Sequence, residues 1–208
     1  DSLRTLTAEL QRIASHLIGI GFILQDLGTL GTPLMYSFRS RERILDLFEM
    51  LCGARITVSY MRPGGVYFDA PDDFWPALDQ FLKDFETEFK EIEQLVLENE
   101  IVMVRTRGVS LLPLDMAINC SVSGPVLRAS GLAWDWRKEA PYDAYDLVEF
   151  DVPTATNGDN YDRFWLRLEE IRQSVRIVEQ CIQQIEPGPV RADVPLVLRP
   201  EPGAEAYG

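Results

Sequence analysis

One acidic side chain, Asp26, lies in a run of apolar and small residues. Between Leu17 and Leu27 the only polar side chains are Gln25 and Asp26. Gly28 can end a helix there, so the carboxylate would meet the negative end of the helix dipole, at a cost of about 0.3–1 kcal/mol. Burying it without a partner would cost more. Two interpretations stay open: an exposed acid at a helix end, or a buried functional carboxylate.

The other residue types that commonly carry chemistry do not gather around Asp26. The single histidine, His16, lies about 15 Å away along a helix and on a different face. The cysteines, Cys52, Cys120 and Cys181, are far apart and form no CxxC pair, which is typical of a reducing compartment. The chain has no GxGxxG, P-loop or GxSxG motif. We therefore expect no metal site and no cofactor bound by this chain.

The composition argues against several functions. With 208 residues, of which 46% are hydrophobic, the chain can bury one sizeable core. Its net charge of −13 argues against binding to nucleic acid or directly to an anionic membrane surface. No apolar run reaches the roughly 18–20 residues of a membrane span. Because the chain opens in mid-pattern, we expect it to be part of a longer protein.

Hydrophobic periodicity predicts four helices, at about 4–28, 39–51, 73–98 and 160–186. Apolar residues at steps of three and four mark the first helix: Leu6, Leu10, Ile13, Leu17, Ile20, Leu24 and Leu27. This helix would run roughly 37 Å, enough to cross a domain. Its last third is apolar on the other faces too, so we expect burial there on more than one side.

The connections are predicted as irregular. Residues 29–37 form a loop, 62–65 a tight turn, and 99–160 a long excursion with one short helix after Pro113. Arg39, Arg41 and Arg43 begin the second helix against its dipole, which favours acidic partners elsewhere. For at least two of them we expect a solvated helix face instead.

The predicted fold is mainly α. It is a helical bundle of three long helices plus one shorter helix, with long irregular connections. Residues 1–186 form the helical domain, including the 99–160 excursion, and 187–208 form a Pro-rich extended segment.

Several motifs add a resemblance to a known family. They are GAR (53–55), RPGGV (62–66), LR and SG (127–131), PYDAYDLVEFDVP (141–153), GDNYDR (158–163) and EEIRQS (169–174). Together they resemble the 49-kDa (D) subunit of respiratory complex I, the NADH–quinone oxidoreductase. The resemblance covers nearly the whole chain and corresponds to the central helical part of that family.

The resemblance implies a fold shared with the large subunit of nickel–iron hydrogenases, without the metal-binding cysteines. It also implies a role in forming the quinone cavity. The family's long-helix acid falls on Asp26, where it pairs with a histidine from outside this chain. The residues expected to line the cavity are Ile18, Phe22, Leu34 and Met35, and those expected to face the cluster of a partner subunit are Arg55 and Thr57.

Two positions depart from the family pattern. Leu34 and Met35 stand where many members have two phenylalanines. Thr57 stands where many have a histidine near the cluster. The second departure leads us to expect a weak pH dependence of the cluster potential.

The resemblance also implies partners and a location. The expected substrate is a quinone, with a 4Fe-4S cluster in the adjoining subunit, and with NAD and FMN elsewhere in the complex. The partners are the subunit that carries the terminal iron–sulfur cluster and the membrane-arm subunit at the quinone channel. The chain would lie peripheral to the inner or cell membrane, on its cytoplasmic side, through the complex.

Two alternatives remain. One is the large subunit of a membrane-bound, complex-I-like nickel–iron hydrogenase, in which CxxC pairs would flank this region. The other is a non-catalytic helical adaptor, which gives Asp26 no quinone-linked role.

Overall fold

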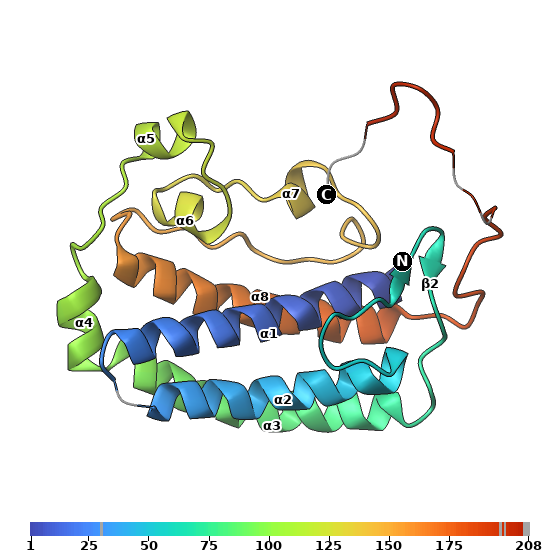
Figure 1. Ribbon diagram of the computed structural model, residues 1–208, viewed down its shortest axis with the longest axis horizontal. Helices are drawn as coiled ribbons and strands as arrows, with labels where there is room; N and C mark the ends of the chain where they lie inside the picture. Colours follow the sequence, from blue (N-terminus) through green and yellow to red (C-terminus); the bar gives the residue numbers. More distant parts are fainter. Residues whose placement is uncertain (30, 196, 198, 206–208) are drawn as a thin grey trace.

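Four long helices lie side by side and form the body of the molecule (Figure 1). The structure is a computed structural model, and it describes residues 1–29, 31–195, 197 and 199–205. The long helices are α1 (Ser2–Asp26), α2 (Thr32–Cys52), α3 (Phe74–Leu97) and α8 (Asn160–Gln184). α1 packs against α2 and α8, and α3 closes the arrangement by packing against α2 and α8. The predicted mainly α fold is confirmed.

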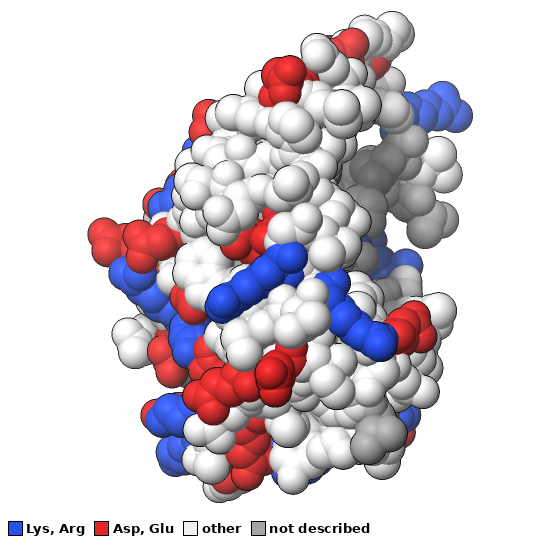
Figure 2. All heavy atoms as spheres, turned by 90° about the vertical axis from the view of Figure 1, so that its left-hand side faces the viewer, with Lys and Arg blue, Asp and Glu red and all other residues white. Residues whose placement is uncertain are grey.

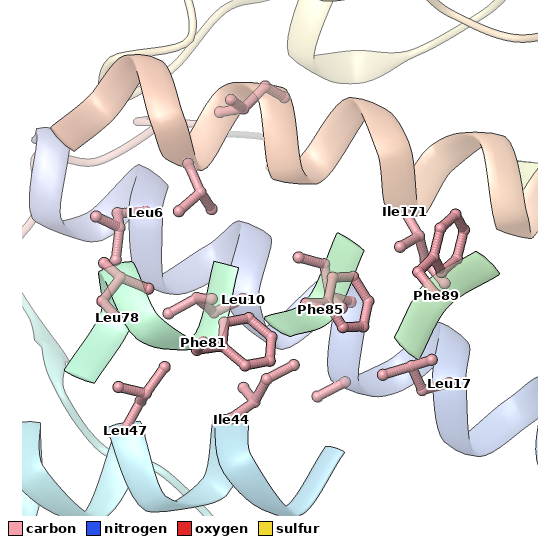
Figure 3. Close-up of a cluster of buried hydrophobic side chains, with 14 of the residues drawn as sticks. Leu6, Leu10, Leu17, Ile44, Leu47, Leu78, Phe81, Phe85, Phe89 and Ile171 are labelled. Atoms are coloured by element: carbon pink, nitrogen blue, oxygen red, sulfur yellow. The ribbon is translucent and has the colours of Figure 1, made fainter. Parts of the chain in front are cut away.

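The apolar stripe of α1 supplies the centre of the core. Its first six members, from Leu6 to Leu24, are fully buried. Figure 3 shows that Leu10 and Leu17 lie among Phe81, Phe85 and Phe89 of α3, with side chains of α2 alongside. Each such leucine contributes about 1.5–3 kcal/mol through burial, so this stripe fixes which face of α1 turns inward.

The second helix is longer than predicted. α2 begins at Thr32 and has 21 residues, so the expected loop at 29–37 and the expected shorter helix are both wrong. Pro33 lies in the first turn, where its missing N–H costs nothing and its fixed φ suits the helix. The bundle therefore has four long helices among the described residues rather than three.

Two of the three arginines in α2 have acidic partners on α3, so the expectation of a solvated face for at least two of them is wrong. Arg39 Nη2 lies 2.7 Å from Glu91 Oε2, and Arg43 lies 2.7 Å from Asp84 and 3.1 Å from Glu88. These ion pairs lie along the contact between α2 and α3 and help to fix the orientation of the two helices relative to each other.

The excursion between α3 and α8 contains more helix than predicted. Its short helices are α4 (Glu100–Thr106), α5 (Leu114–Asn119), α6 (Gly124–Ala129) and α7 (Trp136–Glu139). α5 follows Pro113 as expected, whereas the irregular assignment of the other three is wrong. Each has seven residues or fewer, about two turns at most, which is too short for a hydrophobic period to show.

The predicted tight turn joins two short strands, β1 (Met61–Arg62) and β2 (Gly65–Val66). The extended segment after α8 lies across this hairpin, because the Val66 N–H donates to the Val190 carbonyl (3.0 Å). Gly65 has φ +152°, and a Cβ there would lie 2.2 Å from the Val190 oxygen. Only glycine fits this crossing. The positions 196, 198 and 206–208 of the predicted Pro-rich segment lie outside the described residues.

Within the described part of the chain, no helix combines the length and the apolar character needed to cross a membrane.

Candidate functional site

The carboxyl end of α1 is the first candidate site, because Asp26 is the last residue of the helix. Asp26 is exposed, and its neighbours Phe22 and Ile23 are 49% and 45% exposed. The prediction that this part of α1 is buried on more than one side is therefore wrong within the chain. Polar contacts hold the helix end, since Thr29 Oγ1 donates to the Leu24 carbonyl at 2.8 Å. Asp26 is accessible to a ligand or a partner that covers this end.

The start of α2 lies directly against this end of α1. A Cβ on Gly21 would come within 3.0 Å of Leu34 Cδ1, so glycine permits the close approach of the two helices. Phe22 and Phe38 meet edge to face with their ring centroids 5.8 Å apart. Leu34 is half-buried and Met35 is 68% exposed. The four residues predicted to line the cavity thus lie on α1 and α2 at this end, as does Asp26: they are Ile18, Phe22, Leu34 and Met35.

Exposed apolar side chains continue from this point onto the excursion. The end of α1, the start of α2, α4 and α5 lie at the same end of the molecule (Figure 1). Figure 2 looks onto this end: its upper area shows few charged side chains, and Lys, Arg, Asp and Glu side chains cross the middle below that area. We call the exposed apolar side chains at this end the apolar end face, and they are Phe22, Ile23, Met35, Ile101, Val104, Val109, Leu111, Leu114, Met116 and Ile118. Exposed apolar side chains gathered at one end of a molecule commonly mark a surface that binds a ligand or a protein.

The residues predicted to face a cluster lie elsewhere. Arg55 and Thr57 follow the carboxyl end of α2, where the chain turns back along that helix. Thr57 lines a hollow together with Gln11 of α1 and Arg41 of α2, and Gln11 is 15 residues before Asp26, about 22 Å along α1. Arg55 is paired with Asp46 and Glu42 of α2. Thr57 is exposed and has φ +57°, a left-handed conformation that is strained for a β-branched residue. The structure therefore does not bring these two residues together with Asp26.

A second arrangement, which the sequence did not predict, is a chain of buried ionic contacts beneath the excursion. It begins at Glu9 of α1, which is fully buried. Arg137 Nη1 donates to both Glu9 oxygens at 3.0 and 3.2 Å, while Tyr145 and Ser174 donate to them at 2.5 and 2.6 Å. Arg137 also holds Asp135 in a two-pronged contact at 3.0 and 2.8 Å.

The chain of contacts continues to α8 and returns to α1. Arg128 lies 3.7 Å from Asp135 and donates to Glu170 Oε1 at 2.9 and 2.6 Å. The second oxygen of Glu170 contacts His16 Nε2 at 2.7 Å. We call the six ionisable residues of this path the buried charge chain: Glu9, Arg137, Asp135, Arg128, Glu170 and His16. Each is at most 6% exposed.

The charges along this path alternate, and the pKa values respond accordingly. Burial by itself raises the pKa of Glu170. The hydrogen bond from His16 and the positive charge of Arg128 have the larger, opposite effect, so the pKa of Glu170 falls to about 2. Burial likewise raises the pKa of Asp135, and Arg137 lowers it to about 2. For His16, burial lowers the pKa against the opposing effect of Glu170. The carboxylates are therefore charged and His16 is neutral at pH 7.

The buried charge chain leaves one trace in the sequence: polar residues recur at helical spacing next to the apolar stripes of α1 and α8. Glu9 and His16 are seven residues apart on α1, and Glu170 and Ser174 are four apart on α8, so each pair shares one helix face. A charged or polar pair on a buried face requires partners. His16 and Ser174 find their partners across the contact of α1 with α8, in Glu170 and Glu9. The cationic partners of the two glutamates come from residues 128–137, which have no period of their own, and so that pairing could not be read from spacing.

The described residues include no group of three or more histidine, cysteine, aspartate or glutamate side chains placed to hold a metal ion. The cysteines are unpaired, with Cys120 exposed and Cys181 buried.

Comparison with known proteins decides the family. Residues 26–207 match the family model described as respiratory-chain NADH dehydrogenase, 49 Kd subunit. The chain belongs to this family. The resemblance inferred from the motifs is confirmed, and the match to the 49-kDa subunit family begins at Asp26 itself.

Curated relatives carry the corresponding name. The NADH-quinone oxidoreductase D subunit of Dehalococcoides mccartyi (strain ATCC BAA-2266 / KCTC 15142 / 195) is 50% identical over 207 residues, which are 100% of this chain and 56% of the relative. The corresponding D subunit of Desulforamulus reducens is 47% identical with the same coverage. The D 2 subunit of Rhizobium meliloti is 43% identical over 95% of this chain and 49% of its own length. The chain thus spans about half the length of these 49-kDa family relatives.

Proposed function

We propose that this chain is a peripheral-arm subunit of NADH–quinone oxidoreductase that forms part of the wall of the quinone cavity. In the proposed complex, NAD and FMN act in other subunits, and the adjoining subunit brings electrons through its terminal 4Fe-4S cluster. Family membership supports the complex. The observation that carries the site is the exposed apolar end face with Asp26 at its edge.

The chemistry of a quinone matches this surface. Its ring and tail are apolar and favour side chains such as Phe22, Leu34 and Met35, with half-buried Ile18 one helical turn before Phe22. Reduction to the quinol takes up two electrons and two protons at the ring oxygens. A cavity for this reaction therefore needs an apolar wall and a polar group that can help deliver protons.

Asp26 takes the second role in this proposal. A carboxylate that becomes covered keeps its charge only beside a cation or a hydrogen-bond donor. In the family such a donor is a histidine from a portion outside this chain. Asp26 orients that histidine and sets its proton affinity, rather than touching the quinone ring itself. This step links the arrival of electrons to the uptake of protons, and hence to proton translocation by the complex.

The partners cover the apolar end face and the loop beyond α2. The subunit with the terminal cluster and the membrane-arm subunit at the quinone channel bury the side chains of the face, which this chain leaves in solvent. Arg55 and Thr57 face the cluster-bearing subunit. The complex holds the chain at the membrane, on its cytoplasmic side.

The test is the Asp26→Asn variant in the assembled complex. Asparagine keeps the shape and removes the charge, so the rate of quinone reduction should fall about 10²-fold or more, as for the loss of a positioned proton-transfer group. Electron transfer from NADH to a hydrophilic acceptor that bypasses the cavity should stay normal.

The control is Asp79→Asn, which alters another exposed acid, on α3, in a surface pair with Lys83. It should change neither activity. Unchanged quinone reduction in Asp26→Asn would overturn the proposed role of Asp26 and favour a helical adaptor.

A further inference from the structure

The segment that carries much of the apolar end face is not attached to the body of the molecule by the hydrophobic core. The core cluster draws side chains from all four long helices and from residues 142–152, but it takes none from residues 103–141. The buried apolar side chains of that segment, Ala117, Leu127 and Ala129, lie outside the cluster. Something other than the main core must therefore hold this segment in place.

Two arginines make its deepest polar contacts. Arg128 of α6 reaches Glu170 on α8, and Arg137 of α7 reaches Glu9 on α1. Asp135 lies between the two arginines and contacts both. The segment is thus tied to two helices at once.

Other hydrogen bonds of the segment are internal or lie at its exposed edge. Ser130 Oγ donates to the Leu112 carbonyl at 2.8 Å, and the Ala155 N–H donates to the Arg128 carbonyl at 3.0 Å, both within the 99–160 excursion. Two exposed bonds reach the long helices: Arg105 donates to the Leu27 carbonyl at the end of α1 (2.7 Å), and Arg163 of α8 donates to the Ser110 carbonyl (2.8 Å). These two bonds lie before residue 111, whereas the buried contacts of Arg128 and Arg137 hold the later part of the segment.

The two kinds of attachment differ physically. Apolar burial is non-directional, so it fixes position through the fit of side-chain shapes rather than through individual contacts. A buried ion pair tolerates little displacement, because a separated charge in the interior has no water to compensate it. Ionic contacts therefore specify position better than they add stability.

We infer that the buried charge chain holds residues 103–141 in one fixed position relative to α1 and α8. Glu9, Arg137, Arg128 and Glu170 are positioning residues in this sense. By fixing the segment, they set where the α5 side of the apolar end face stands relative to Asp26. This last step rests on the proposed function of that face.

The test measures the position of the segment relative to α8 directly, in the full chain within its complex. Spin labels at Glu139→Cys on α7 and Glu179→Cys on α8 report the distance between the segment and the body, with Cys120→Ser removing the exposed native thiol. Glu9→Gln is then introduced. The distance distribution should broaden and shift, because Arg137 loses its anchor on α1.

A milder variant guards against failure to assemble. Tyr145→Phe removes only the hydroxyl that donates to Glu9, and it should broaden the distribution to a smaller degree. The control is Glu93→Gln, which removes an α3–α8 ion pair with Arg172, whose side chain is 41% exposed. It should leave the distribution unchanged. If neither Glu9→Gln nor Tyr145→Phe changes the distribution, the inference is overturned.

Activity separates this inference from the proposed function. A shifted segment should slow quinone reduction about 10- to 100-fold, the scale expected for a misplacement near 1 Å, while the rate with a hydrophilic acceptor is kept. A changed distance with unchanged quinone kinetics would support the positioning role and refute the link of the end face to quinone.

Discussion

The substitution Glu170→Gln gives the sharpest test of the energetics of the buried charge chain. The Glu170 side chain is 1% exposed and accepts hydrogen bonds from Arg128 and His16. Glutamine keeps its size but removes its charge. Arg128 would keep the Trp134 carbonyl at 2.9 Å and lose its closest anion, so that Asp135 at 3.7 Å would be its nearest remaining carboxylate.

The size of the effect follows from the carboxylate itself. Its pKa is lowered from 4.5 to about 2, because the contacts with His16 and Arg128 outweigh the effect of burial. That drop corresponds to about 3 kcal/mol of stabilisation at neutral pH. It agrees with the lower end of the roughly 3–5 kcal/mol lost when one partner of a buried pair is removed.

Hydrogen exchange in the assembled complex measures this loss locally. If α6 and α7 exchange when the segment lifts from α8, about 3 kcal/mol should accelerate exchange of their amides about 150-fold. Since the stabilisation is present above pH 4.5 and is lost as the pH falls toward 2, the difference between variant and wild type should shrink in that range.

The matched control is Glu93→Gln, because its partner Arg172 is 41% exposed. Such a pair is worth about 0–1 kcal/mol, so exchange should rise about fivefold at most. Acceleration below about tenfold in Glu170→Gln, or equal acceleration in both variants, would refute the reasoning.

Three further predictions concern other positions. Burial lowers the pKa of His16 in the folded chain, so as the pH falls the unfolded chain takes up this proton first. The free energy of unfolding should therefore fall as the pH drops below 6.5, by up to about 1.4 kcal/mol per pH unit. Hydrogen exchange from pH 7.5 to 5 should show this slope, and His16→Gln should abolish it. The potential of the partner's cluster should depend weakly on pH in the native complex, and redox titration should show that Thr57→His restores the dependence; a steep native dependence would contradict this. Gly65→Ala should release the segment after α8 from the hairpin, because the added Cβ meets the Val190 oxygen; limited proteolysis should then cut that segment faster, whereas Gly31→Ala, in open space, should have no effect.

The long helices could be predicted from the sequence because each buries a stripe with a regular period. The stripe from Leu6 to Leu24 is buried throughout. The last long helix begins at residue 160 as predicted, and the Asp159 side chain caps it by accepting from the Asp162 N–H at 2.8 Å. The predicted start of α2 was wrong because Pro33 suggests a loop, although a proline also fits the first turn of a helix.

The candidate site was predicted only in part. The sequence singled out Asp26, yet the expectation of burial assumed that every apolar face is covered by the same chain. Phe22 and Ile23 show that the face is left for something else. The buried charge chain was beyond reach, because Glu9 and Arg137 are 128 positions apart and no local pattern joins them.

The position of Glu170 on the last long helix has a consequence for synthesis of the chain. Arg128 leaves the ribosome 42 residues before Glu170, a delay of about 2–8 s at 5–20 residues per second. During that interval one of the two anchors of α6 and α7 does not yet exist. The segment that contains α5 and its exposed apolar side chains is then not yet attached to α8. Binding by a chaperone should therefore be concentrated in the interval before α8 emerges, and it should end when Glu170 meets Arg128.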